Sequence, residues 1–237
     1  MYKSRILVGL LVLFYIVFVF FQLKGNLTLA ENFDALLVPT ITLAYFLFVK
    51  RKTLFFSLFL ILFSISDLMV LIDDYIPYKI DYFVGNALYI LAYVSLFLKI
   101  CKSISIIHVL KNFKIHLIVL IALSFYIVYV LQVIIDPYVK MTNEYYVELV
   151  YNIVMLVTLS ASLLNFFYRD NNKSLYLFIG VLCIVFSEVI WVAYTYVAER
   201  NLLNIISGTL SLLAFYFFYK QSKLVDEDKK EIVMVIE

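Results

Sequence analysis

The stretch TLFFSLFLILFSISDLMVLIDDY, residues 53–75, is a long apolar block with a single acid, Asp67, well inside it. Asp73 and Asp74 mark the end of the block. In a helix that rises ~1.5 Å per residue, Asp67 lies about 9 Å deeper than Asp73. About 20 mainly apolar residues are typical of a membrane-spanning helix. The stretch therefore predicts a span that carries a carboxyl group inside the membrane.

The whole chain has the composition of a membrane protein. Of its 237 residues 65% are hydrophobic, and the mean hydropathy is +1.01. Soluble domains are nearer half apolar, so a soluble fold could not bury the excess. We expect an all-α, polytopic membrane helix bundle. The net charge of +2 and the lack of a basic patch interleaved with aromatic residues argue against nucleic acid as a partner.

Charged residues, prolines and asparagines divide the apolar blocks into eight predicted transmembrane helices. Their expected ranges are 5–23, 35–49, 53–72, 82–100, 116–135, 147–168, 174–198 and 202–219. The second range is short for a span. An even number of spans places both termini on the same side of the membrane.

Basic residues identify that side as cytoplasmic. Fifteen of the 19 Lys and Arg residues fall on the side of the termini, and four fall in the opposite loops. The fifteen are Lys3, Arg5, Lys50, Arg51, Lys52, Lys99, Lys102, Lys111, Lys114, Arg169, Lys173, Lys220, Lys223, Lys229 and Lys230. The four are Lys24, Lys79, Lys140 and Arg200. Such a bias is the positive-inside pattern, so we expect both termini in the cytoplasm.

We expect one transmembrane domain over residues 1–220 and a short cytoplasmic tail over 221–237. The halves 1–115 and 116–220 are candidates for a parallel repeat, because Ser66-Asp67 matches Ser187-Glu188. A span with a glycine, Gly85 or Gly208, follows each pair. Residues 101–115 mix Lys with Ile, Val and Leu and are expected to lie along the inner membrane surface.

Several chemistries lack their sequence signals. Cys101 and Cys183 fall at a cytoplasmic helix end and inside a span, so we expect no disulfide. Zinc-like Cys and His spacings, glycine-rich phosphate loops and a G-x-S-x-G elbow are absent from the sequence. We therefore expect no metal and no cofactor.

Asp67 and Glu188 are the acids that lie well inside predicted spans. A carboxylate at the centre of a bilayer costs about 2.5–3.5 kcal/mol on insertion scales. No Lys, Arg or His lies at a comparable depth in the sequence, so each acid must be protonated, bind hydroxyl and amide donors, or face a wet cavity. A structural role in joining helices and a role in a functional cavity both fit.

Candidate donors recur at helical spacing on neighbouring spans, and so share a face of each helix. They are Asn86, Tyr89 and Tyr93 in the fourth span, Tyr151, Thr158, Ser162 and Asn165 in the sixth, and Trp191 in the seventh. Such polar stripes also commonly hold transmembrane helices together, so that alternative stands beside substrate binding.

Three stretches resemble the YhhN family of membrane proteins, whose characterised members are lysoplasmalogenases. They are LLVPTITLAYFLF in the second span, LFSISDLMVLI with YFVGNALYILAYVSLFL in the third and fourth, and FIGVLCIVFSEVIWVAYTYV in the seventh. The resemblance implies hydrolysis of the vinyl-ether bond of lysoplasmalogens. It also implies that Asp67 and Glu188 are the catalytic acids, one protonating the enol ether and the other activating or orienting water.

The chain departs from the family pattern where the family tends to have Lys-Pro in span two, Gly-Asp in span three, and His in span four. The corresponding residues are Val38-Pro39, Ser66-Asp67 and Ala92-Tyr93. The seventh-span Asp is Glu188, and the last span lacks the polar residue expected near Ala214. These departures predict a divergent member.

The sequence leaves three functions open. The first is a lipid hydrolase of the lysoplasmalogenase kind, and the second is a non-catalytic lipid-binding or sensory protein of the same family. The third is a proton-coupled small-solute transporter, because deep acids also serve proton relays. For the first two the expected partner is a membrane lipid or lysophospholipid. The high Ile, Lys, Asn, Phe and Tyr content suggests a bacterial cytoplasmic membrane, and the oligomeric state is left open.

Overall fold

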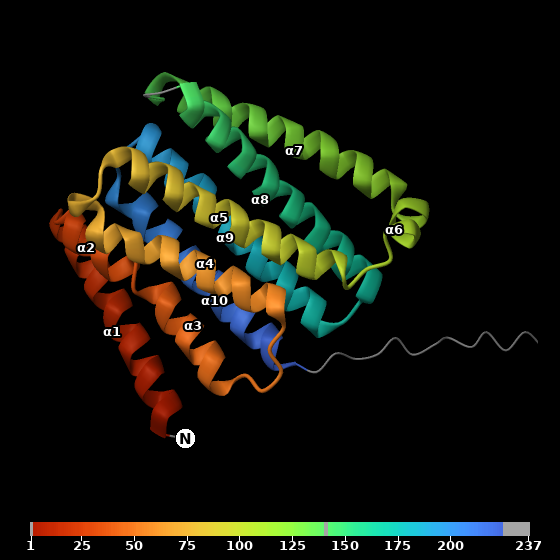
Figure 1. The fold of residues 1–237 in the computed structure, drawn as a ribbon, viewed down its shortest axis with the longest axis horizontal. Coiled ribbons are helices and arrows are strands. Elements are labelled where there is room, and N and C mark those ends of the chain that lie inside the picture. The colour runs from red at the N-terminus through yellow and green to blue at the C-terminus, as the bar shows by residue number, and fades with distance from the viewer. Residues whose placement is uncertain (1, 140–141, 225–237) are drawn as a thin grey trace, which may run out of the picture.

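The computed structural model describes residues 2–139 and 142–224, which form helices joined by short connections and no β-strand (Figure 1). The helices are α1 (Tyr2–Lys24), α2 (Leu27–Asp34), α3 (Leu37–Phe48), α4 (Leu54–Met69), α5 (Tyr78–Cys101), α6 (Ile106–Asn112), α7 (Lys114–Ile135), α8 (Thr142–Arg169), α9 (Asn172–Tyr196) and α10 (Asn201–Lys223). Short 3₁₀ helices, η1 (Val70–Tyr75) and η2 (Asp136–Tyr138), extend α4 and α7.

The described residues contain eight helical segments that are long and apolar enough to cross a membrane. This confirms the predicted all-α architecture and the number of spans, and it makes the chain an integral membrane protein by length and composition. The segments are Arg5–Lys24, Leu27–Phe48, Leu54–Tyr75, Tyr78–Cys101, Lys114–Tyr138, Asn143–Arg169, Asn172–Tyr196 and Asn201–Lys223.

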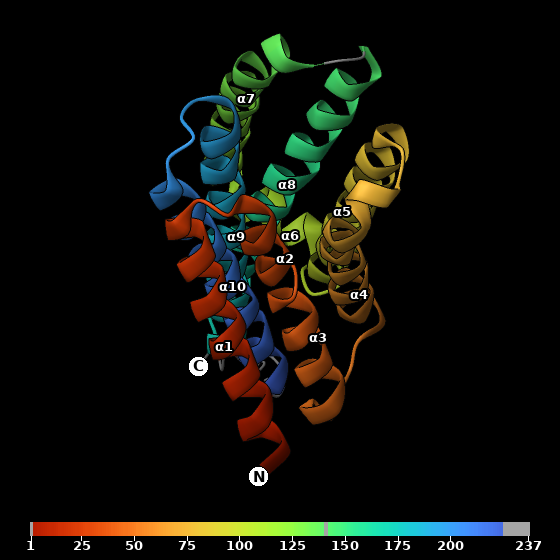
Figure 2. The same ribbon diagram turned by 90° about the vertical axis from the view of Figure 1, so that its left-hand side faces the viewer.

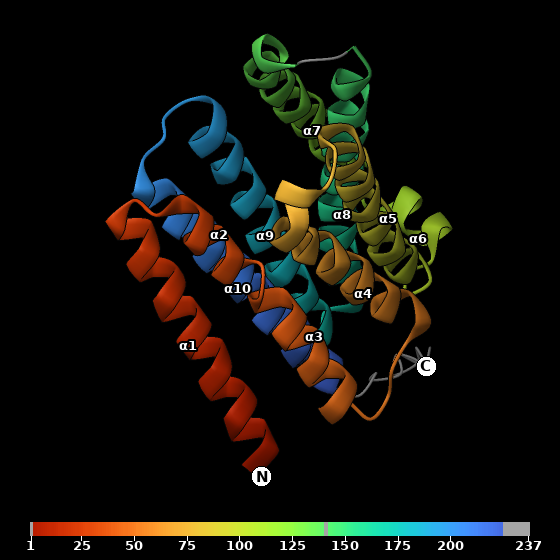
Figure 3. The same cartoon turned by 60° about the vertical axis from the view of Figure 1, so that its left-hand side comes forward.

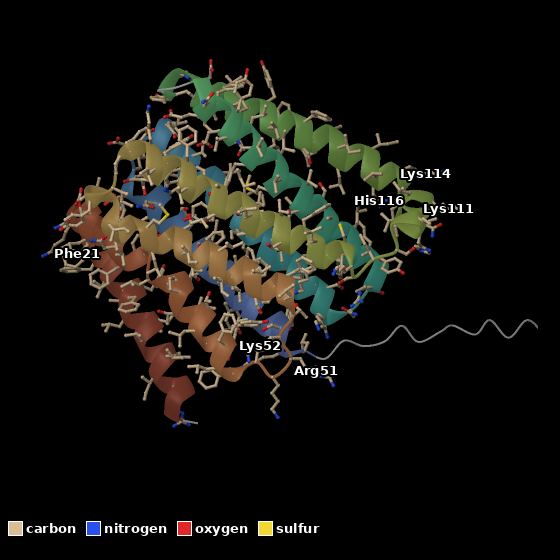
Figure 4. All side chains as sticks on the ribbon, viewed as in Figure 1. Phe21, Arg51, Lys52, Lys111, Lys114 and His116 are labelled. Carbon is tan, nitrogen blue, oxygen red and sulfur yellow. The ribbon has the colours of Figure 1, made fainter. Side chains whose placement is uncertain are left out.

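Helices α1 and α7 form opposite edges of the bundle (Figure 1). Only 11% of the most apolar window of α1 and 17% of that of α7 are buried, so both present most of their surface to the surroundings. The start of α1, the α3–α4 connection and the end of α10 lie at one end of the bundle (Figures 2 and 3). We call it the basic end, because Arg51, Lys52, Lys111 and Lys114 lie there, away from Phe21 (Figure 4).

The second span is broken in the middle, which the sequence analysis did not predict. Residues 27–34, expected to be loop, form α2, and the chain turns at Ala35 and Leu36 before α3. Pro39 accounts for the break. A helix continuing through it would bring the proline ring against the carbonyl of Ala35, whereas in the first turn of α3 the missing N–H leaves no intrahelical bond unmade.

Aromatic rings fill the middle of the bundle between α4 and α10. Phe59 stacks on Phe215 with ring centroids 5.8 Å apart and planes 1° from parallel, and Phe63 meets Phe215 edge-on at 4.9 Å. The rings of Phe59, Phe215 and Phe218 are fully buried. This aromatic contact fixes the rotation of α4, and therefore the direction in which Asp67 projects one turn beyond Phe63.

The hairpins α4–α5 and α9–α10 share one local contact. Ser66 Oγ donates to the carbonyl of Gly85 at 2.9 Å, and Ser187 Oγ donates to the carbonyl of Ser207 at 2.8 Å. The serine before the deep acid therefore bonds to the carbonyl of the glycine in one hairpin, and to the carbonyl of the residue before the glycine in the other. The contact is what a parallel repeat would produce, and the repeat of 1–115 with 116–220 stays a prediction.

Two segments predicted to lie outside the spans can be compared with the structure. The predicted interfacial segment 101–115 contains a short separate helix, α6. The tail predicted over 221–237 begins later, because α10 continues through Lys223. Residues 225–237, including Lys229 and Lys230, lie outside the described residues.

Gly180→Ala tests the close approach of α9 to α10. A Cβ at this position would lie 2.6 Å from the buried Phe218 ring and 3.2 Å from the Ala214 carbonyl, so the substitution should destabilise the protein by about 1–3 kcal/mol. Gly9→Ala is the matched control, because nothing lies within 4 Å of that Cβ. Thermal unfolding in detergent measures both, and equal midpoints would contradict the expectation.

Candidate functional site

Asp67 lies near the end of α4 with its side chain turned into the bundle, where it is 9% exposed. The Tyr89 hydroxyl of α5 donates to Asp67 Oδ1 at 2.6 Å. Phe63 packs against the Tyr89 ring at 4.7 Å between centroids, which holds the hydroxyl toward the carboxyl. The first deep acid is thus bound by a donor from a neighbouring span, as a carboxyl removed from water requires.

Glu188 lies in α9 and is partly buried. Its carboxyl faces Tyr151 of α8 and is close enough to Tyr93 of α5 for an electrostatic interaction. Both tyrosine side chains are buried, and the Tyr93 hydroxyl has no hydrogen-bond partner. The second deep acid therefore also faces hydroxyl groups from other spans.

The tyrosine rings connect the two acids. Tyr151 lies 6.3 Å from Tyr89 and 5.7 Å from Tyr93 between ring centroids, each pair edge-to-face. Asp67 and Glu188 themselves are close enough for their charges to interact. Asp67 of α4 and Glu188 of α9, 121 positions apart in the sequence, are thereby brought to one region. Tyrosines of α5 and α8 connect them there.

Asp34, the last residue of α2, is a third acid in this region. Its Oδ1 atom lies against Gly208 of α10, where a Cβ would come within 2.9 Å of it. Its charge interacts with those of Asp67 and Glu31. The break in the second span therefore places an additional carboxyl within electrostatic range of Asp67. We call Asp34, Asp67, Glu188, Tyr89, Tyr93 and Tyr151 the acid cluster.

The acid cluster has hydroxyl donors and no basic partner among the contacts found in residues 2–139 and 142–224. Neighbouring carboxyls cannot all be ionised cheaply in a region of low dielectric, so the cluster favours holding protons. Over the same residues, no three His, Cys, Asp or Glu side chains are arranged to hold a metal ion. The arrangement can therefore donate, accept and pass protons.

Three of the predicted binding residues bond to their own helices. Asn86 Nδ2 donates to the Tyr82 carbonyl at 2.9 Å, Thr158 Oγ1 to the Val154 carbonyl at 2.7 Å, and Ser162 Oγ to the Leu159 carbonyl at 2.7 Å. Thr158 also lies 3.5 Å from the Tyr93 carbonyl, which joins α8 to α5. The three bonds within a helix satisfy these side chains locally. Only the Thr158 contact with α5 supports the alternative that the polar stripe holds helices together.

Two other predicted binding residues lie apart from the acids. Asn165 lines a cavity at the basic end of the bundle. Trp191 is 46% exposed at the surface of α9. Of the predicted site residues, the structure therefore brings together Asp67, Glu188, Tyr89 and Tyr93. Sequence reasoning did not select Asp34, because the acidic and polar residues of 31–34 were interpreted as an outer loop.

Comparison of the chain with protein-family models, with curated proteins and with solved structures gives no match.

Tyr89→Phe tests whether the hydroxyl stabilises Asp67. Removing the donor leaves a buried carboxyl oxygen unbound, which should cost about 1–3 kcal/mol. Tyr93→Phe, one turn along the same helix, is the matched control. Because the Tyr93 hydroxyl is buried without a partner, its loss should be neutral or stabilising. Thermal unfolding of the two variants would refute this account if Tyr93→Phe were the more destabilised.

Proposed function

We propose that the chain is a divergent member of the YhhN family that hydrolyses the vinyl-ether bond of lysoplasmalogen-type lysophospholipids. The observation that carries the proposal is the meeting of Asp67 and Glu188 across tyrosines of α5 and α8. The family resemblance assigns these two acids to catalysis, and the interaction between their charges supports a joint role. The proposed partner is a lipid of a bacterial cytoplasmic membrane.

The proposed reaction needs a proton donor and a proton acceptor. One carboxyl protonates the β-carbon of the vinyl ether, which leaves an oxocarbenium ion at the carbon bonded to oxygen. The other carboxyl takes a proton from the water that attacks this carbon. As the hemiacetal breaks its bond to the glycerol oxygen, the second carboxyl gives that oxygen the proton it took from water, and the hemiacetal hydroxyl returns a proton to the first carboxylate as it becomes the carbonyl of the fatty aldehyde. One water is consumed, and both acids recover their starting protonation states at the end of the cycle.

A bilayer location suits this reaction. The substrate is an amphiphile that reaches the acids from the membrane, and the oxocarbenium ion forms beside carboxylates whose negative charge stabilises it in a low dielectric. The tyrosine hydroxyls are polar groups that can orient the attacking water. The oligomeric state does not enter the mechanism.

The direct test follows aldehyde release from lysoplasmenylethanolamine by purified protein. Asp67→Asn and Glu188→Gln should each lower the rate about 10²–10⁴-fold, the usual contribution of general acid–base catalysis. Asp73→Asn, an exposed acid beyond the end of α4, is the control and should leave the rate unchanged. Binding of the lipid without aldehyde release from the unaltered protein would favour the non-catalytic lipid-binding function.

The broken second span favours a second candidate, a proton-coupled transporter for small solutes. Transporters bind substrate and ions where a transmembrane helix is interrupted, and here the interruption carries Asp34 next to Asp67. Three acids from α2, α4 and α9 resemble a proton relay.

Proton flux measured in proteoliposomes distinguishes the transporter from the hydrolase. Transport predicts that an imposed pH gradient collapses faster than in empty vesicles once the solute is present, and that Asp34→Asn slows the collapse. Asp34 has no assigned role in hydrolysis, so aldehyde release that depends on Asp67 but survives Asp34→Asn, with no proton flux, would exclude the transporter.

We also propose that both termini face the cytoplasm. Arg51, Lys52, Lys111 and Lys114 lie at the end of the bundle (Figure 4) where α1 begins and α10 ends (Figure 3), which fits the positive-inside pattern. A fluorescent reporter that matures only in the cytoplasm should be active when fused after residue 237. A reporter inserted in the α9–α10 connection at Glu199 should be dark, and the reverse result would invert the topology.

A further inference from the structure

A cavity of about 190 Å³ opens at the basic end of the bundle, far from the acid cluster. Six helices contribute to its walls: α3, α4, α5, α8, α9 and α10, together with the α3–α4 connection, where Arg51 lies (Figure 4). Its volume corresponds to about six water molecules at roughly 30 Å³ each. Because small-molecule pockets usually measure roughly 300–1,000 Å³, this one suits a small polar group.

The cavity is strongly cationic. Five of the fifteen residues that line it are basic and none is acidic. The five are Arg51, Lys99, Lys102, Arg169 and Lys173. They come from the α3–α4 connection, the end of α5, the end of α8 and the start of α9, so their convergence is a property of the fold. Basic side chains gathered around one small space attract an anion.

Local contacts hold several of these cations in place. Lys99 Nζ lies 4.0 Å from the centre of the Phe56 ring, and Lys102 Nζ lies 4.3 Å from that of Phe55. Arg169 Nε donates to the Ser103 carbonyl at 3.1 Å. Basic residues near helix C-termini are ordinary, since they complement the helix dipole. That effect does not explain the unpartnered amides in the cavity wall.

Two buried amides of the cavity wall lack hydrogen-bond partners. Gln221 is 1% exposed, and neither its Nε2 nor its Oε1 atom has a partner. Asn165 is 2% exposed, and its Oδ1 atom has none. A buried polar atom without a partner is costly, and such atoms are commonly satisfied by an ordered water or a bound ion. Since the oxygen and nitrogen of an amide exchange places by rotation, both side chains can present an N–H to an anion.

The start of α4 adds backbone donors. Thr53, Phe55 and Phe56 line the cavity, and the Thr53 side chain makes no capping bond to the first turn of α4. The N–H groups of a helix's first turn have no intrahelical partner and carry a partial positive charge. Their position beside the five cations and the two amides makes a built anion site.

We propose that this cavity binds a phosphate group. Phosphate matches it in size, in negative charge and in its oxygen acceptors, which can take bonds from guanidinium, ammonium, amide and backbone N–H groups together. Basic pockets between transmembrane helices are a known setting for phosphorylated headgroups. The group can belong to an anionic lipid or to free phosphate, and the chemistry is the same for both.

The phosphate site is separate from the acid cluster. Along α4, Phe56 precedes Asp67 by eleven residues, and along α9, Leu177 precedes Glu188 by eleven, so each helix separates the two regions by about 16 Å. The glycerol unit that joins the phosphate of a lysoplasmalogen to its vinyl ether is too short for this distance. One lipid cannot occupy both sites, and the inference does not depend on the proposed hydrolysis.

The test is thermal unfolding of the full-length protein in an uncharged detergent, with sodium phosphate against sodium chloride at equal ionic strength. Phosphate should raise the midpoint saturably, because it binds only the folded state. Gln221→Leu should raise the midpoint without phosphate, since it removes an unpartnered buried amide, and should weaken phosphate binding at least about 10-fold. Lys102→Gln, at an exposed position of the rim, should weaken binding without harming the fold.

Lys111→Gln is the matched control, because this exposed lysine lies at the same end of the bundle and outside the cavity. It should bind phosphate as the unaltered protein does, and so should Asp67→Asn. Equal effects of phosphate and chloride would overturn the proposal, as would unchanged binding in both Gln221→Leu and Lys102→Gln.

Dihexanoyl phosphatidic acid, used below its micelle concentration, identifies the source of the phosphate. Action at concentrations at least about 10-fold lower than phosphate supports a lipid headgroup, and equal potency supports free phosphate. If neither compound raises the midpoint, the site does not bind phosphate.

Discussion

The cost of a carboxyl group inside a membrane governs this structure. Asp67 and Glu188 cannot be solvated by lipid, so each must be bound by groups that the neighbouring spans provide. Tyr89 donates to Asp67, and Tyr151 faces Glu188, which ties α4, α5, α8 and α9 together around the acids. The aromatic core of α4 and α10 then fixes the rotation that lets these partners meet.

The sequence was enough to predict most of the fold, because apolar blocks bounded by charged residues indicate the membrane-spanning helices directly. It did not show the break before Pro39, since α2 is polar enough to look like a loop. This helix is capped by Asn26 and packs mainly against α1. Asp34 was overlooked for the same reason. Its place next to Asp67 depends on the turn at Ala35 and Leu36 and on the absence of a side chain at Gly208, neither of which a hydropathy pattern records.

The candidate site shows the limit of helical periodicity. Spacing indicated which face of α8 carries Tyr151, Thr158, Ser162 and Asn165, but a face extends along the whole helix. Tyr151 lies with the acids and Asn165 lies in the cavity at the other end, 14 residues further on, although both belong to one stripe. The cationic cavity was hidden as well, because the positive-inside pattern already accounted for each basic residue separately.

The two polar regions divide the bundle into chemically different halves. One gathers carboxyls among tyrosines, and the other presents positive charge and unpartnered amides near the basic end. The proposed hydrolysis would use the first for proton exchange within the lipid, and the proposed phosphate site would serve recognition at the membrane surface. The account depends first on the acids forming a single group.

Infrared difference spectroscopy of the carboxyl C=O stretch tests most directly whether Asp67 and Glu188 form a single group. If Asp67 and Glu188 share one site, Glu188→Gln removes its own band and also shifts the band assigned through Asp67→Asn, because each carboxyl senses the other's charge and hydroxyl partners. An Asp67 band that is identical in frequency and titration with and without Glu188 would show that the acids are independent, and would contradict the acid cluster.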